Sequence, residues 1–136
     1  MLRPLWRFEV HRSFSRPSIL VVDDDSDFRE LLKIELRLDG FDVMEATDGL
    51  SALRQLDARR PDVVVLDLQM PLVNGLEVRE ELAARPDTQN LPVIIVTGTD
   101  WPVPFPSDAV VRKSESTSVV LSAVVEALAG IRDGSR

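Results

Sequence analysis

The chain has 136 residues and a mass of 15.2 kDa, which is the size of a single domain. Apolar residues make up 44% of it and charged residues 29%, a composition typical of a folded globular protein and unlike that of a disordered chain. Cysteine is absent, which excludes a disulfide framework, thiolate metal sites and thiol nucleophiles.

No segment of the sequence predicts a membrane span or a secretory signal. The longest apolar runs, such as residues 93–96, are far shorter than the ~20 residues that a spanning helix needs. A signal peptide needs an apolar stretch of about 7–15 residues near the start. Charged residues interrupt every such stretch in residues 1–17. A cytoplasmic protein with no membrane contact is therefore expected.

The formal net charge of −7 is unevenly distributed along the chain. Residues 1–17 contain four arginines and one glutamate, so this segment carries +3 and the remainder carries −10. An acidic body argues against direct binding of nucleic acid, because nucleic-acid phosphates bind basic faces. The charge is compatible with a divalent cation or with a partner that has a basic patch.

The first part of the chain predicts two strands and two helices. Residues 18–22 form an apolar, β-branched run without alternation, which indicates a strand buried on both faces. A helix follows, with Asp27 as its cap and Glu30 as the partner of that cap, and Gly40 ends it. Asp25 is expected to be a solvated loop carboxylate or, alternatively, a helix cap. Residues 41–46 predict a second strand. The second helix carries its apolar stripe at Leu50, Leu53 and Leu56.

The rest of the chain predicts three further strands and two further helices. The clearest buried strand begins after Pro61 and ends on Asp67, and a third helix follows it. A fourth strand ends on Thr97, and residues 109–112 predict a fifth strand. The last helix is expected over residues 116–131. Helical spacing gives apolar stripes in these two helices at Leu76, Val78 and Leu82, and at Val120, Val124, Leu128 and Ile131.

Alternating strands and helices predict an α/β fold. The expected architecture is a single doubly wound, five-stranded parallel sheet with helices on both faces. In such folds the functional site lies beyond the carboxyl ends of the strands, at the point where the strand order reverses. The residues at those ends therefore indicate the chemistry.

Polar side chains follow four of the five strands: Asp23 and Asp24, Asp67, Thr97 and Lys113. Any one of them could simply punctuate a turn, but their recurrence at successive strand ends favours a shared site. Three carboxylates in contact repel one another, so a cation must accompany them. Oxygen ligands without His or Cys point to Mg²⁺.

A carboxylate beside a metal ion, an ammonium and a hydroxyl forms a socket for a phosphoryl group. The positive charges neutralise the phosphoryl oxygens while a carboxylate oxygen attacks the phosphorus in line. A carboxylate can serve as such a nucleophile and become an acyl phosphate. The pattern therefore predicts phosphoryl transfer onto an aspartate.

Several short motifs together resemble the receiver domain of two-component response regulators. They are VVDDD at residues 21–25, VLDLQMP at residues 65–71 followed by Asn74-Gly75, VTG at residues 96–98, and VRK at residues 111–113. The resemblance covers residues 18–131 and implies the flavodoxin-like receiver fold. Residues 1–17 would then be an N-terminal extension, and residues 132–136 a C-terminal tail.

The resemblance also implies a role for each site residue. Asp67 would be the phosphoacceptor and would also bind the Mg²⁺ ion. Asp24 would bind the ion directly, Asp23 would bind it through water, and the backbone carbonyl of Gln69 would be a further ligand. Two more residues would contact the phosphoryl group: Thr97 by a hydrogen bond and Lys113 by an ion pair.

The function that the resemblance implies is that of a phosphorylation-dependent signalling switch. A sensor histidine kinase or a histidine phosphotransfer protein would donate the phosphoryl group, and an unknown downstream protein would receive the signal by contact. The domain would be no enzyme beyond its own phosphorylation and dephosphorylation. Residues 132–136 are too few for a DNA-binding module, so a stand-alone receiver or an excised domain is expected.

The sequence departs from the family pattern beside the lysine. Ser114 follows Lys113 where the family usually has proline, and Val110 stands where the family often has an aromatic switch residue. These departures keep open an adaptor of the same fold that works without phosphorylation. A phosphatase or phosphotransferase of the haloacid-dehalogenase type would need a second acid two positions after the nucleophile, and that position holds Gln69.

The segment between the fourth and fifth strands is unusually short and contains three prolines in alternation. Proline removes a backbone donor and disfavours a helical residue before it. We therefore predict an extended or turn-like conformation for residues 99–108, so that the fourth of the family's five helices is short or missing. Trp101, Val103 and Phe105 would then cover the sheet, or alternatively form an exposed docking strip. Backbone chemical shifts measured by NMR would test this, and a regular helix of two or more turns would contradict it.

The same departure has a functional consequence. In the family, the face made by the fourth helix, the fifth strand and the fifth helix is a common site of activated dimerisation. That face would not form normally here, so a different partner surface is expected. Phosphorylation-driven dimers built on the usual face would contradict this expectation.

Overall fold

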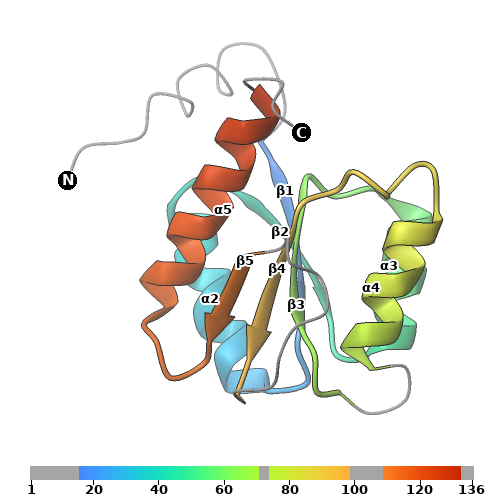
Figure 1. Cartoon of the computed structure of the whole chain (residues 1–136). Helices are drawn as coiled ribbons and strands as arrows, with labels where there is room; N and C mark the ends of the chain where they lie inside the picture. The colour runs from blue at the N-terminus through green and yellow to red at the C-terminus, as the bar shows by residue number, and fades with distance from the viewer. Residues whose placement is uncertain (1–15, 71–73, 99–108, 133–136) are drawn as a thin grey trace.

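The computed structural model describes residues 16–70, 74–98 and 109–132. These residues contain five strands and four helices (Figure 1). In chain order the elements are β1 (Ser18–Val22), α2 (Ser26–Leu38), β2 (Asp42–Ala46), α3 (Gly49–Ala58), β3 (Val63–Asp67), α4 (Gly75–Ala84), β4 (Val93–Thr97), β5 (Ala109–Arg112) and α5 (Thr117–Arg132).

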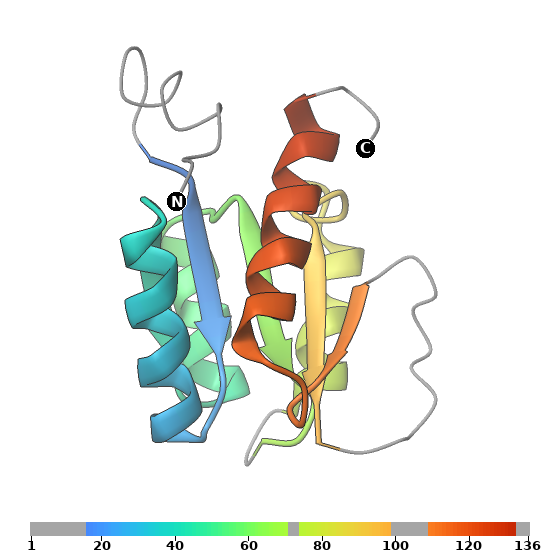
Figure 2. The same cartoon turned by 90° about the vertical axis from the view of Figure 1, so that its left-hand side faces the viewer.

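The five strands form one parallel sheet in the order β2-β1-β3-β4-β5. Helices α2 and α5 cover one face, and α3 and α4 cover the other (Figure 1). Figure 2 shows α2 and α5 side by side on their face of the sheet. The predicted doubly wound α/β fold is confirmed. The strand order reverses between β1 and β3, which places a functional site at their carboxyl ends.

The three central strands have every residue buried, as the runs of aliphatic residues predict. Alternate residues point to opposite faces, so each strand contributes to two cores. Ile19 and Val21 pack with α2 and α5, whereas Leu20 and Val22 pack with α3 and α4. Burial of each such side chain contributes about 1.5–3 kcal/mol, which makes the sheet a rigid support for the residues at its edge.

The start of α2 differs from the sequence prediction. Asp25 is its N-cap and accepts hydrogen bonds from the backbone N–H groups of Asp27 and Phe28, so the prediction that Asp27 caps the helix was wrong. Asp27 lies instead in the first turn, where a carboxylate interacts favourably with the helix dipole. Gly40 follows the helix with a φ of 95°, the left-handed conformation expected of a glycine that ends a helix.

The stripe predicted for α3 is only partly buried. Leu56 lies in the core and Leu53 packs against it, but Leu50 is 42% exposed. Ala52 occupies the buried position instead. Periodicity alone did not separate these positions, because three leucines and one alanine of the same helix all fit an apolar stripe.

The predictions for residues 99–108 and for the N-terminal extension fall mostly outside the described residues. The adjacent strand β5 is well defined by its pairing with β4. Only Val111 of β5 is buried, and Val110 is 47% exposed on the opposite face. None of the described helices is long and apolar enough to cross a membrane.

Candidate functional site

Three carboxylates meet at the carboxyl ends of β1 and β3. Asp23 and Asp24 directly follow β1, and Asp67 is the last residue of β3, the neighbouring strand. One carboxylate oxygen from each residue lies within 4.8 Å of the other two. Asp23 and Asp67 are almost fully buried, whereas Asp24 is exposed. The sheet therefore creates a concentrated negative charge that opens to solvent on one side.

Lys113 brings a positive charge to these carboxylates from the end of β5. Its Nζ donates a hydrogen bond to Oδ1 of Asp23 at 3.0 Å and lies 2.9 Å from Oδ2. The same Nζ lies 3.5 Å from Oδ2 of Asp67. Phe28 of α2 places its ring centroid 5.1 Å from this ammonium, a cation–π contact. The amine of Lys113 is therefore held beside Asp67 by contacts on several sides.

The loop after β3 folds back on Asp67. The backbone N–H of Gln69 donates to Oδ1 of Asp67 at 3.1 Å, and the N–H of Gly75 donates to the carbonyl of Leu68 at 3.1 Å. A Cβ at position 75 would collide with the backbone oxygen of Asp67. Glycine is therefore required there, because a side chain would push the start of α4 away from Asp67.

Thr97 ends β4 beside the acidic cluster. It is 3% exposed, and its carbonyl accepts a hydrogen bond from the backbone N–H of Lys113 at 2.9 Å. That bond fixes the ends of β4 and β5 relative to each other. Gly98 comes next and is exposed, and a Cβ there would meet no atom of the described residues within 4 Å.

The electrostatics of the cluster favour a bound cation. Burial is the largest cause that raises the pKa of Asp67, from an ordinary value of 3.8 to about 7, and the charge of Asp23 raises it further. The N–H of Gln69 and the charge of Lys113 oppose this rise. For Lys113, burial lowers the pKa of the amine, but the hydrogen bond and charge of Asp23 and the charge of Asp67 outweigh burial and raise it.

The donor set fits a small, hard divalent cation. All three side chains offer carboxylate oxygens, the ligands that Mg²⁺ prefers. Among the described residues, buried Oδ2 of Asp23 accepts no hydrogen bond, although Lys113 lies close to it. The exposed side of Asp24 leaves room for the water molecules that Mg²⁺ usually keeps.

The structure brings together five of the six residues predicted for the site: Asp23, Asp24, Asp67, Thr97 and Lys113. Gln69, the sixth, contacts Asp67 through its backbone N–H. The role that the resemblance gives to its carbonyl, as a ligand of Mg²⁺, stays a prediction. The contact of Phe28 with Lys113 was not predicted. Only the fold brings those two residues together, since they are far apart in the sequence.

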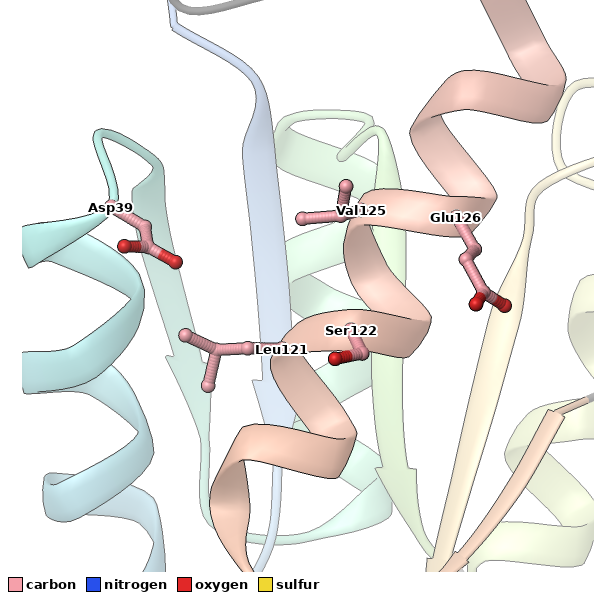
Figure 3. A pocket seen from close by; sticks show the side chains of 5 residues that line it. All are labelled: Asp39, Leu121, Ser122, Val125 and Glu126. Atoms are coloured by element: carbon pink, nitrogen blue, oxygen red, sulfur yellow. The ribbon is translucent and has the colours of Figure 1, made fainter. Parts of the chain in front are cut away.

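A shallow pocket lies between the C-terminal end of α2 and the middle of α5 (Figure 3). The acidic cluster adjoins the N-terminal end of α2, and a helix of this length spans about 20 Å. The pocket is therefore separate from the cluster. Its lining contains none of the residues predicted for the site and consists of Asp39, Leu121, Ser122, Val125 and Glu126.

Comparison with known protein families identifies the domain. The response regulator receiver domain matches residues 19–103 of the chain. The chain belongs to this family. The resemblance carried by the short motifs is thereby confirmed, and the domain is a receiver of the two-component signalling systems.

The curated relatives are bacterial regulators. The transcriptional regulatory protein PrrA of Mycobacterium leprae is 45% identical over 83 residues, which cover 61% of this chain and 35% of that protein. The response regulator MprA of Mycobacterium sp. strain KMS is 45% identical over 82 residues, covering 60% and 35%. The chain spans about a third of the length of these relatives. Because one of them is named as a transcriptional regulator, the predicted lack of direct nucleic-acid contact is not supported.

Solved receiver structures share the fold. The response regulator TrrA of Thermotoga maritima, in complex with Mg²⁺ and BeF, is 32% identical with a TM-score of 0.73, covering 82% of this chain and 98% of that one. The receiver domain of a signal transduction histidine kinase from Syntrophus aciditrophicus is 28% identical with a TM-score of 0.76, covering 85% and 92%. The predicted flavodoxin-like receiver fold is confirmed.

The raised pKa of Asp67 predicts a pH-dependent stability. A carboxyl whose pKa is higher in the folded than in the unfolded protein stabilises the fold below the unfolded pKa, and this contribution is lost as pH rises through the folded pKa. In metal-free protein, the free energy of unfolding should therefore fall between about pH 4 and pH 7. Asp67→Asn should remove this dependence and should be more stable than the wild type at pH 8 by about 2 kcal/mol, allowing for solvent screening.

Urea unfolding in EDTA at pH 5 and pH 8 would measure this difference. Addition of Mg²⁺ should then stabilise the wild type more than Asp67→Asn, because only the native wild-type cluster binds the ion fully. Equal stability of the two proteins at both pH values would contradict the claim that ionised Asp67 destabilises the metal-free fold.

Proposed function

We propose that this receiver is a phosphorylation-dependent switch in which Asp67 accepts the phosphoryl group with the help of Mg²⁺. The observation that carries the proposal is the convergence of three carboxylates and one ammonium, with Nζ of Lys113 3.5 Å from Oδ2 of Asp67. The donor would be a sensor histidine kinase or a histidine phosphotransfer protein in the cytoplasm. Output would follow by contact with a downstream protein.

Mg²⁺ would be held by Asp24 and Asp67, by Asp23 through water, and by the backbone carbonyl of Gln69. It would supply positive charge that offsets the carboxylates and the phosphoryl oxygens. Loss of the proton from Asp67 is needed before attack, because only the carboxylate is nucleophilic. The pKa of about 7 places this loss near neutrality even without the ion.

The reaction would be an in-line displacement. A carboxylate oxygen of Asp67 forms a bond to phosphorus, while the bond from phosphorus to the imidazole nitrogen of the donor histidine breaks. The imidazole leaves with the electron pair, and Asp67 becomes an acyl phosphate. Nζ of Lys113 would pair with a phosphoryl oxygen, and the hydroxyl of Thr97 would donate a hydrogen bond to another. In this proposal the domain catalyses only its own phosphorylation and dephosphorylation, and it acts as a switch rather than as an enzyme.

A phosphorylation-independent adaptor is the second candidate. The observation that favours it is Val110, an exposed aliphatic residue where the family often has an aromatic switch residue. All acidic residues of the site and Lys113 are nevertheless present and close together. This retention supports phosphorylation, with rearrangement around Thr97 as the response.

The receiver would comprise residues 18–131, between the extension of residues 1–17 and the tail of residues 132–136.

Asp67→Asn should abolish phosphorylation by acetyl phosphate, because the amide lacks the nucleophilic oxygen. Intact-mass spectrometry should show the gain of one phosphoryl group for the wild type in Mg²⁺ and none in EDTA. Asp87→Asn, at an exposed position outside the cluster, is the matched control and should react like the wild type. A mass gain of Asp67→Asn equal to that of the wild type would show that another residue is the acceptor.

Lys113→Met should separate phosphorylation from its structural response. The ammonium is a charge-assisted partner that a neutral side chain cannot replace, whereas the carboxylates that would hold Mg²⁺ remain. Amide NMR shifts at Thr97 and Gly98 after addition of acetyl phosphate would measure the response. We expect these shifts in the wild type and their loss in Lys113→Met. A variant that responds like the wild type would show that Lys113 does not contact the phosphoryl group.

A further inference from the structure

Arg29, in the second turn of α2, reaches back to the turn that carries the acidic pair. Its Nη1 donates a hydrogen bond to the backbone carbonyl of Asp23 at 2.8 Å. Its Nε donates to Oε1 of Glu45 at 3.2 Å, and its side chain is only 16% exposed. The planar guanidinium therefore joins two different strands, because Asp23 follows β1 and Glu45 belongs to β2.

Glu45 is itself held in place. Its Oε2 lies 3.3 Å from Nζ of Lys33, which also pairs with Glu30 at 2.7 Å. Its backbone carbonyl accepts a hydrogen bond from Nε2 of Gln55 at 3.3 Å. The carboxylate of Glu45 is thus a fixed point on the edge strand. Because Arg29 binds both Glu45 and the carbonyl of Asp23, the fixed carboxylate of Glu45 also restrains the backbone of Asp23.

The acidic turn needs such a restraint. Asp23, Asp24 and Asp25 are consecutive, so the three charges repel one another and the nearby Asp67 as well. The N–H of Asp25 donates to Oδ1 of Asp23 at 2.9 Å, and the N–H of Asp23 donates to the carbonyl of Ala46 at 3.1 Å. These bonds leave the carbonyl of Asp23 to Arg29, whose fork binds it and Glu45 at once.

We infer that Arg29 and Glu45 are positioning residues for the cation site: they hold the backbone of Asp23 so that Asp23 and Asp24 face Asp67. The inference rests on the proposed function, in which these carboxylates hold Mg²⁺. Neither Arg29 nor Glu45 would touch the ion. Groups that orient metal ligands commonly change metal affinity by 10–100-fold when they are removed.

A purely electrostatic role makes a different prediction. The charge of Arg29 repels a cation and that of Glu45 attracts one, so charge alone predicts that Arg29→Gln tightens Mg²⁺ binding and Glu45→Gln weakens it. Positioning predicts that both substitutions weaken binding. The double variant keeps the net charge of the wild type. Charge alone therefore predicts wild-type affinity for Mg²⁺ in this variant, whereas positioning predicts weaker binding.

The test is the Mg²⁺ dissociation constant of each variant of the full chain, measured by isothermal titration calorimetry. We expect about tenfold weaker binding for Arg29→Gln, for Glu45→Gln and for the double variant, because all three break the same connection. Arg29→Lys keeps the charge and loses the planar fork, so it should also bind more weakly. Arg37→Gln is the matched control, an exposed position of the same helix, and should bind like the wild type.

Wild-type or tighter affinity in Arg29→Gln, with weakened binding only in Glu45→Gln, would overturn the inference. Circular dichroism and urea unfolding in EDTA would confirm that each variant is folded. If Arg29→Gln does not fold, the Mg²⁺ affinity of Arg29→Lys tests the inference in its place. The two levels of the account fail differently. If the wild type does not bind Mg²⁺, the proposed function is refuted. If the wild type binds Mg²⁺ and the variants bind it with the same affinity, only the positioning role is refuted.

Discussion

The repulsion among three carboxylates at one edge of the sheet is the constraint on which the rest of the site depends. Asp23 and Asp67 are buried within reach of each other, an arrangement that is unfavourable when both are ionised. Lys113 offsets part of this charge from β5, and its own position is fixed by Phe28 and by the backbone of Thr97. The remaining negative charge favours a bound cation, and in the proposed function that cation and Lys113 would together offset the charge of the phosphoryl oxygens.

The sheet brings these carboxylates together and holds them against their mutual repulsion. The aliphatic strands β1, β3 and β4 bury every residue and so fix where each strand ends. Because β1 and β3 are neighbours, Asp23 and Asp67 must meet. Local contacts then set the details: Gly75 lets α4 approach the backbone of Asp67, and Arg29 fastens the turn after β1. The sheet therefore supplies a stable support, and the residues at its strand ends and in the adjoining loops form the candidate site.

Strand ends were the part of the site that the sequence could predict, because buried runs and the residues after them are local features. The helix cap was misassigned, since Asp25 and Asp27 both fit a capping pattern and only the backbone geometry distinguishes them. The contact of Phe28 with Lys113 depends on tertiary packing and leaves no trace in local spacing. Arg29 did carry a signal, a basic residue within two turns of an acidic pair.

A structure of the protein with Mg²⁺ and beryllium fluoride tests the central claim most directly, because the fluoride complex mimics a phosphoryl group on a carboxylate. The account predicts beryllium bonded to Asp67, the ion bound by Asp24 and Asp67, and Nζ of Lys113 turned from Asp23 toward a fluorine atom. Beryllium bonded to another residue, or an ion bound away from the three carboxylates, would contradict the account.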